Sequence, residues 1–319
     1  MRIVTLEEHI SLPEMTARLP KGAMSFQKPE LADITGDRLK AMDEQGVTLQ
    51  VLSVDSLGAQ LLGPDQSPAF AKEYNDLVAE KIAGHGDRFA AFAHLPMTAP
   101  AATAGELERV VKKYGFKGAM IRGMTGDKFL DHPDYEPLLA KAEELQVPVY
   151  IHPGIPHPDV AKIYYGGLPD NPGIDQALAC YGWGWHAETA VQVLRLYVAG
   201  IFDRHPGLKV IIGHMGEMLP MMLERSNRAF ANDRAPQRQR SLKQTFREQL
   251  YITTSGFFTF PPLQLTLDTM GVDNILFSID YPFSDLKTGV DFLNNLPLPD
   301  DQKRKIAHAN ADKLLHLEK

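Results

Sequence analysis

The sequence predicts an α/β fold, a single (β/α)8 TIM barrel over residues 1–319 with long loops at the carboxyl face of its strands. Short apolar runs that favour β-structure alternate along the chain with segments of helical periodicity. No linker, low-complexity tract or change of composition divides the 319 residues. A barrel of this type takes about 250 residues and tolerates insertions. The length therefore suits one domain with added loops.

Eight apolar runs predict the eight strands of the barrel. Several are apolar on both faces until their last residues, as expected for parallel strands covered by helices. The runs are residues 3–9, 47–54, 88–96, 116–122, 147–153, 208–215, 250–256 and 275–282. The clearest helical segment is 186–203, with Ala190, Leu194 and Tyr197 on one stripe. Segments 106–114, 135–145 and 284–296 are similar.

Two stretches, residues 11–31 and 154–185, interrupt this alternation. They follow the first and fifth strands, so we expect both as long loops at the active-site face of the barrel. The second contains Trp183 and Trp185, which favours a lid or a subunit interface. An open doubly wound sheet is the alternative fold, but no glycine-rich phosphate turn follows the first strand.

Composition excludes several classes of protein. The net charge of −7 provides no basic field for nucleic acid. Cys180 is the only cysteine, which excludes internal disulfides and cysteine-based zinc clusters. The first residues lack a signal-peptide core, and no stretch approaches the roughly 18 apolar residues of a membrane span. We expect a cytoplasmic protein that binds neither nucleic acid nor membrane.

Polar groups stand where four of the apolar runs end. Glu7 and His9 close the first run, His152 the fifth, His214 the sixth and Asp280 the eighth. Alternation points Glu7 and His9 to the same side. Since strand ends meet around one mouth of a barrel, Glu7, His9, His152 and Asp280 can converge on one divalent metal ion. His94 also follows a strand, but a lone histidine there is more often a satisfied core residue, and we leave it out.

With these motifs the chain resembles the amidohydrolase superfamily, in its branch of metal-dependent aromatic-acid decarboxylases. The likeness is to gamma-resorcylate, 2,3-dihydroxybenzoate and aminocarboxymuconate semialdehyde decarboxylases, over nearly the whole chain. The residues that carry it are TLEEH at 5–9, DRLKAMD at 37–43, VYIHP at 149–153, FDRHP at 202–206, IGHMGE at 212–217 and ILFSIDYP at 275–282.

The resemblance implies roles for individual residues. Glu7, His9, His152 and Asp280 would bind one metal ion, and the lysine that bridges two metals in binuclear relatives has no counterpart in residues 118–122. His214, paired with Glu217, would act beside the metal as a catalytic or substrate-contacting group. Arg225 would lie near the substrate. One departure is Gly154, where the decarboxylases often carry a basic residue.

The implied reaction is nonoxidative decarboxylation of a hydroxylated aromatic or similar unsaturated acid. One Zn²⁺ or Mn²⁺ ion would orient the substrate, with Asp280 as the first candidate proton donor and His214 as the reserve. The alternative is a metal-dependent hydrolase of an amide, lactone or ester on the same site. A catalytically silent barrel is a third hypothesis.

The remaining expectations concern the substrate and the assembly. We expect a small-molecule carboxylic acid as substrate, and a homodimer or homotetramer because relatives of this type form them. Phe26, Trp183 and Trp185 are candidate walls of the substrate pocket.

Overall fold

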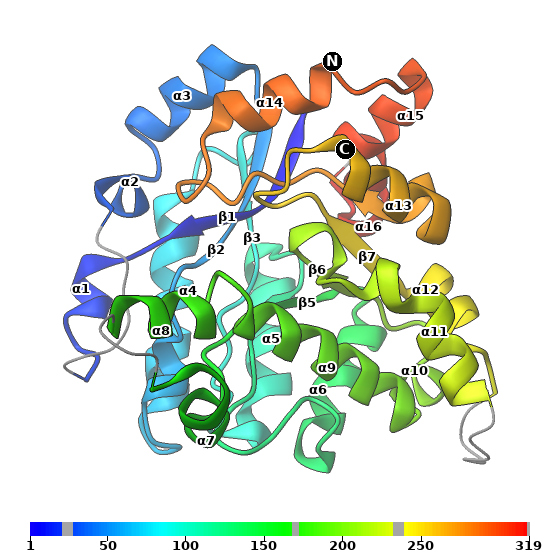
Figure 1. Ribbon diagram of the computed structural model, residues 1–319. Coiled ribbons are helices and arrows are strands. Elements are labelled where there is room, and N and C mark those ends of the chain that lie inside the picture. The colour runs from blue at the N-terminus through cyan, green and yellow to red at the C-terminus, as the bar shows by residue number, and fades with distance from the viewer. Residues whose placement is uncertain (21–27, 168–171, 232–238, 318–319) are drawn as a thin grey trace.

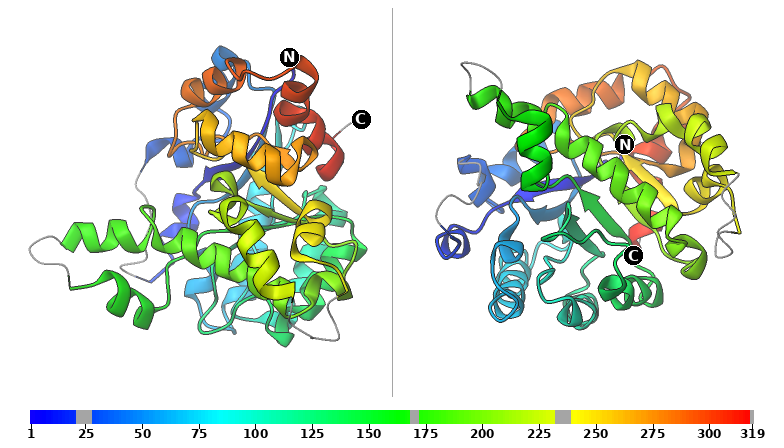
Figure 2. Two further views of the ribbon diagram at one scale, coloured as in Figure 1. Left: turned by 45° about the vertical axis from the view of Figure 1, so that its right-hand side comes forward. Right: turned by 60° about the horizontal axis from the view of Figure 1, so that its bottom comes forward.

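The computed structural model describes residues 1–20, 28–167, 172–231 and 239–317. Eight parallel strands form its centre, and helices surround them (Figures 1 and 2). The strands are β1 Val4–Ile10, β2 Leu49–Val54, β3 Phe89–Ala91, β4 Ala119–Arg122, β5 Val149–His152, β6 Val210–Ile212, β7 Leu250–Thr253 and β8 Ile275–Leu276. The predicted strand order is confirmed, and each strand overlaps its predicted run.

The helices follow the strands in the expected alternation. They are α1 Pro13–Thr16, α2 Pro29–Ala32, α3 Asp37–Gln45, α4 Ser67–Lys81, α5 Pro100–Tyr114, α6 Glu136–Glu144, α7 Pro158–Val160, α8 Pro172–Ala179, α9 Gly184–Val198, α10 Ile201–Arg204, α11 Leu219–Ala231, α12 Leu242–Gln249, α13 Phe260–Met270, α14 Leu286–Asn294, α15 Asp300–Arg304 and α16 Asn310–Leu315. Short 3-10 or π-helical turns are η1 Gly58–Leu61, η2 Pro133–Tyr135, η3 Ala161–Tyr165, η4 His214–Gly216, η5 Val272–Asn274 and η6 Lys305–Ala309.

The strand ladders fall into two sheets, β1-β2-β3 and β4-β5-β6-β7-β8. Single parallel bridges join their edges: Leu6 to Ser278 between β1 and β8, and Ala93 to Ala119 between β3 and β4. The eight strands thus follow one another around the ring in sequence order. At two places, which we call seams, neighbouring strands are joined by one isolated bridge and not by a regular ladder of hydrogen bonds. One seam lies beside Glu7.

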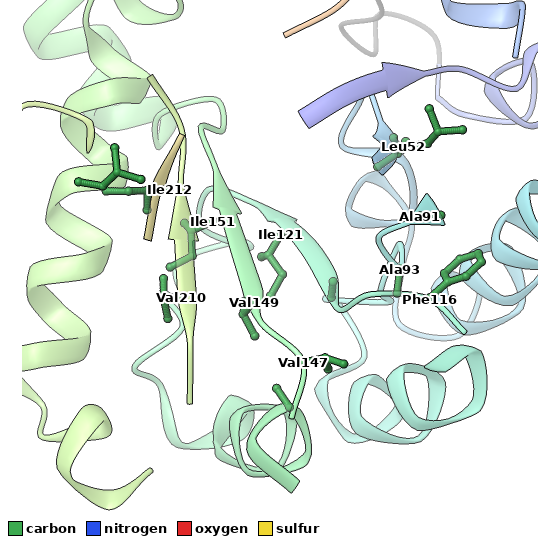
Figure 3. Packing of buried hydrophobic residues seen from close by; sticks show 14 of the residues in the cluster. Leu52, Ala91, Ala93, Phe116, Ile121, Val147, Val149, Ile151, Val210 and Ile212 are labelled. Carbon is green, nitrogen blue, oxygen red and sulfur yellow. The ribbon is translucent and has the colours of Figure 1, made fainter. Parts of the chain in front are cut away.

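Alternate residues of the strands face two separate cores. One set lines the inside of the barrel and includes Leu6, Val51, Phe92, Tyr150 and Ile211, with α16 residues in the same cluster. The other set packs beneath the surrounding helices (Figure 3). In that layer, α5 begins with Pro100, buries Leu107 and Val110, and ends at Gly115 in a left-handed conformation that glycine adopts at little cost.

Two predicted segments differ from the structure. The helix expected over 186–203 is divided into α9 and α10, because Gly200 adopts a left-handed conformation (φ 74°) that ends the first helix. The stretch 154–185, expected as a loop, contains α7, η3 and α8, and α8 extends away from the barrel (Figure 2). Within the described residues, no helix is both long enough and apolar enough to cross a bilayer.

β1 contains a bulge next to Glu7, one of the predicted site residues. Its pairing with β2 slips by one residue between Thr5 and Glu8, and Glu7 has a φ of 64°. Val4 and Leu6 belong to the inner core, so regular alternation would turn Glu7 outward. The extra residue shifts the inward-facing and outward-facing positions of the strand by one. Glu7 and His9 then lie on the same side as His152, while Glu8 accepts hydrogen bonds from the backbone of Ile279 and Tyr281.

Candidate active site

Four side chains from three strand ends meet at the carboxyl face of the barrel. His152 Nε2 lies 3.1 Å from Glu7 Oε1, and His9 Nε2 lies 3.2 Å from Asp280 Oδ1. Ligand atoms of Glu7, His9 and His152 all lie within 4.8 Å of one another. We call Glu7, His9, His152 and Asp280 the strand-end cluster. The predicted convergence is present in the structure.

Two atoms of the strand-end cluster are buried without a hydrogen-bond partner among the described residues. They are Glu7 Oε1 and His9 Nε2. A buried polar atom in this state is costly unless another group satisfies it. The other oxygen of Glu7, Oε2, accepts hydrogen bonds from the hydroxyls of Tyr150 and Ser255. The hydroxyls thus fix the carboxylate and leave Oε1 available to a cation.

The two imidazoles are oriented for metal binding through Nε2. His152 Nδ1 lies 2.7 Å from the carbonyl oxygen of Pro153 and 3.1 Å from Arg122 Nη1, so this nitrogen is held by the protein while Nε2 lies toward Glu7. His9 Nδ1 lies 3.0 Å from Ser53 Oγ. Burial, reinforced by the charge of Arg122, lowers the pKa of His152 to about 3, so its imidazole is neutral at physiological pH. Neutral imidazoles and carboxylates are a ligand set that suits Zn²⁺ or Mn²⁺.

The two carboxylates of the strand-end cluster remain ionised. Burial raises the pKa of Glu7, but the nearby His214, His152 and His9 outweigh burial and hold it well below the usual range. For Asp280, burial is likewise outweighed, here by His214 and His9, and its pKa is lowered. Two carboxylates neutralise the charge of a divalent cation. The residues therefore fit one such ion.

A second group of titratable residues lies beside the first. Glu217 accepts hydrogen bonds from two imidazoles: Oε1 lies 2.8 Å from His214 Nδ1, and Oε2 lies 2.6 Å from His186 Nδ1. We call His186, His214 and Glu217 the Glu217 cluster. The outer nitrogen of His214, Nε2, lies 3.9 Å from Asp280 Oδ2. Burial lowers the pKa of His214, but Glu217 and Glu7 raise it well above the usual value.

Backbone strain concentrates around both clusters. Among the described residues, eight non-glycine residues have a positive φ, and six of them belong to this site or adjoin it. Such conformations cost energy and persist only when the surroundings enforce them. The six are Glu7, His214, Met215, Glu217, Met218 and Asp280. The turn through η4 directs His214 and Glu217 toward each other.

Both clusters border a cavity of about 320 Å³. That volume falls at the small end of the range for ligand pockets. Trp185, Phe257 and Phe283 form an aromatic part of the cavity wall. Asp55 and Arg122 form a buried polar part of it. The cavity is thus suited to a small aromatic molecule with polar substituents.

Of the remaining predicted residues, some line the cavity and others do not. Trp185 lines the cavity, whereas Trp183 is exposed and Phe26 lies outside the described residues. Arg225 is exposed on α11 and is not among the lining residues. His94 accepts a hydrogen bond from the backbone of Ala59 at 2.8 Å, which confirms that it is a satisfied core residue.

Several residues that line this cavity were not predicted from the sequence, among them two charged side chains and one imidazole. Arg122 ends β4 in the same way that His152 ends β5, and Asp55 directly follows β2. Their position after apolar strands was a usable signal. His186 carried no such signal, because it lies in the first turn of α9.

The chain has relatives of known name and structure. The Amidohydrolase family matches residues 8–317. Decarboxylase orsB of Emericella nidulans is 38% identical, covering 99% of this chain and 98% of its own. Gamma-resorcylate decarboxylase of Rhizobium sp. is 37% identical, covering 99% of this chain and 98% of its own.

A crystal structure of a dihydroxybenzoic acid decarboxylase from Polaromonas sp., with bound manganese and 2-nitroresorcinol, superimposes with a TM-score of 0.89. It is 33% identical and covers 100% of this chain and 98% of its own. The predicted resemblance is confirmed: the chain belongs to the amidohydrolase family, in the branch of aromatic-acid decarboxylases.

Proposed function

We propose that this chain is a metal-dependent decarboxylase of a hydroxylated aromatic acid. The observation that carries the proposal is the strand-end cluster, in which buried Glu7 Oε1 and His9 Nε2 lack hydrogen-bond partners among the described residues and face His152 and Asp280. The full-length relatives named decarboxylases support the reaction, and the aromatic cavity wall supports the substrate class.

The metal site is proposed as Glu7, His9, His152 and Asp280. A divalent ion bound there would orient a phenolate and its neighbouring carboxylate and withdraw electron density from the ring. The manganese in the Polaromonas relative makes Mn²⁺ the first ion to test, with Zn²⁺ second. Loading the purified protein with each ion and measuring bound metal and turnover distinguishes them.

Proton transfer is assigned to Asp280 and His214. Decarboxylation needs a proton at the ring carbon that loses its carboxylate, so that the bond to carbon dioxide breaks and the ring recovers its electrons. His214 is the group that stays protonated, and its Nε2 lies 3.9 Å from Asp280 Oδ2. Asp280 can deliver the proton that His214 supplies. Glu217 holds the orientation and charge of His214.

A screen of hydroxybenzoates and simple lactones with metal-replete protein tests the proposal. Carbon dioxide together with a phenol of correspondingly lower mass is the expected result. Ring opening or release of an acid without carbon dioxide would support the alternative hydrolase. Full activity in rigorously metal-free protein would contradict both.

We further propose that residues 1–319 form one domain and that the protein is a cytoplasmic homodimer or homotetramer. Exposed Ile163 and Tyr164 in η3 and exposed Trp183 support an interface over this segment. Arg225, exposed on α11, is retained as a substrate-contacting residue only in such an assembly, where a neighbouring copy can present it. Light scattering combined with an Arg225→Ala variant tests both statements.

A further inference from the structure

Asp55 and Arg122 form a pair of opposite charges in the cavity that the proposed chemistry does not use. Both side chains are buried, at 3% and 7% exposure, and both line the cavity that contains the strand-end cluster. They come from neighbouring parts of the barrel mouth, Asp55 after β2 and Arg122 at the end of β4. Each attracts the other electrostatically.

Asp55 retains an unused acceptor. Its Oδ2 is buried and makes no hydrogen bond with any described residue. Among the described residues no ion pair joins it to Arg122, since the guanidinium is directed to other partners. A buried carboxylate oxygen without a partner costs free energy that a bound ligand could recover.

Arg122 retains an unused donor. Its Nε and Nη2 donate to the carbonyl oxygen of Val54 at 3.2 and 2.7 Å, Nη2 also lies 3.2 Å from His9 Nδ1, and Nη1 lies 3.1 Å from His152 Nδ1. A guanidinium has five N–H groups. These four contacts therefore leave at least one N–H, on Nη1, available to another acceptor.

Because both groups line one cavity, a single substituent that reaches both would satisfy them together. A ring hydroxyl can accept from Arg122 and donate to Asp55. A second carboxylate would be repelled by Asp55, an aromatic amino group accepts hydrogen bonds poorly, and a methoxy group cannot donate. We propose that Asp55 and Arg122 are the specificity-determining residues for a second ring hydroxyl, one that is not held by the metal.

This inference rests on the proposed decarboxylase function and assigns to Asp55 and Arg122 the discrimination between aromatic acids with one and with two ring hydroxyls. The test compares kcat/KM for 2-hydroxybenzoate, its four dihydroxy isomers that retain the 2-hydroxyl, and the matching 2-hydroxy-methoxy acids. One dihydroxy isomer should exceed both its methoxy analogue and 2-hydroxybenzoate by roughly tenfold to a hundredfold, the range for a hydrogen bond to a charged group.

The Asp55→Ala variant should reduce that preference roughly tenfold or more, because the hydroxyl loses its acceptor. Asp55→Asn, which keeps an acceptor oxygen and the side-chain volume, should retain more of the preference. Asp65→Ala changes an exposed acidic residue outside the cavity and serves as the matched control. Metal content is measured for all three variants.

A uniform loss of activity toward all substrates in Asp55→Ala would overturn the inference, as would a wild-type enzyme that turns over 2-hydroxybenzoate and the best dihydroxy isomer equally. Product binding to wild-type protein gives a second readout that needs no variant. In a thermal-shift titration, the diphenol product should bind at least about tenfold tighter than phenol, and equal binding would also overturn the inference. Absence of carbon dioxide from every substrate would refute the proposed function itself.

Discussion

The strand-end cluster and the Glu217 cluster contain the same chemical groups but differ in how their hydrogen bonds are satisfied. Both bring imidazole and carboxylate ligand atoms within 4.8 Å. In the Glu217 cluster, each carboxylate oxygen is already paired with an imidazole nitrogen, at 2.8 and 2.6 Å. In the strand-end cluster, Glu7 Oε1 and His9 Nε2 make no hydrogen bond with any described residue, although His152 Nε2 and Asp280 Oδ1 lie 3.1 and 3.2 Å from them.

That difference supports the proposal of a metal site in the strand-end cluster and a proton-handling site in the Glu217 cluster. Proximity of ligand types alone would assign an ion to both clusters. The unsatisfied buried atoms favour the strand-end cluster, because an ion bound there would replace the missing interactions. The Glu217 cluster is complete without an ion, and its carboxylate instead stabilises a protonated His214.

The largest expected effect comes from Asp280, which adjoins both clusters. Asp280→Asn removes the carboxylate that can carry a proton while preserving the volume of the side chain. We expect kcat to fall by roughly a thousandfold, within the range for loss of a general acid. Steady-state turnover, with circular dichroism to confirm folding, measures this. Turnover near that of the wild type would remove Asp280 from the mechanism.

The next effect distinguishes the clusters by their metal content. His152→Gln removes one nitrogen ligand and should weaken metal binding by at least about a hundredfold, more than the loss of a supporting hydrogen bond costs. Glu217→Gln, the comparison variant, should keep its metal. Elemental analysis after dialysis against a weak chelator measures both. Equal metal loss in the two variants would break the distinction drawn above.

Glu217→Gln should instead affect turnover. An amide cannot stabilise a protonated His214 as a carboxylate does, so we expect kcat to fall by roughly ten- to a hundredfold. In the pH profile, the decline of kcat on the alkaline side should also begin at a lower pH than in the wild type, because the pKa of His214 falls. A pH profile identical to that of the wild type would contradict the assigned role.

The smallest effect concerns Glu188, a half-buried carboxyl group that makes no ion pair with any described residue. Burial raises the pKa of Glu188 to about 7, and backbone N–H groups of Met124 and His157 offset this only in part. Between the ordinary pKa of 4.5 and about 7, the folded chain keeps a proton that the unfolded chain loses. The free energy of unfolding therefore falls as the pH rises through this window.

Glu188→Gln removes that dependence. Relative to the wild type, the variant should gain about 1–2 kcal/mol of stability between pH 5 and pH 8. Denaturant unfolding at the two pH values measures the difference. A constant difference would show that Glu188 is ionised in the folded protein, as Glu7 is.

The sequence was sufficient to predict the barrel and the convergence of its strand ends. Apolar runs and helical stripes report burial directly, and parallel strands bring their carboxyl ends to one mouth. Alternation correctly placed Glu7 and His9 on one side, but it does not predict that this side faces the interior of the barrel. Val4 and Leu6 face the same interior, and only the bulge turns Glu7 inward as well.

Other residues could not be found by local pattern. His186 belongs to the cavity because α9 begins over the barrel mouth and brings it to Glu217, a contact across 31 positions of the chain. Helices α7 and α8 form within a proline-rich stretch in which many apolar residues remain exposed, so hydrophobic periodicity gave little sign of them. The exposure of Arg225 likewise depends on the packing of α11, which a motif does not encode.

The seam between β1 and β8 would give an ion bound there a mechanical role. A single bridge joins Leu6 to Ser278 there, while Glu7 and His9 approach from one edge and Asp280 from the other. A cation bound by all three side chains would cross-link the first strand of the barrel to the last. Removing it should loosen the barrel along this line before any other, so that hydrogen exchange accelerates first at the backbone amides of Leu6 and His9.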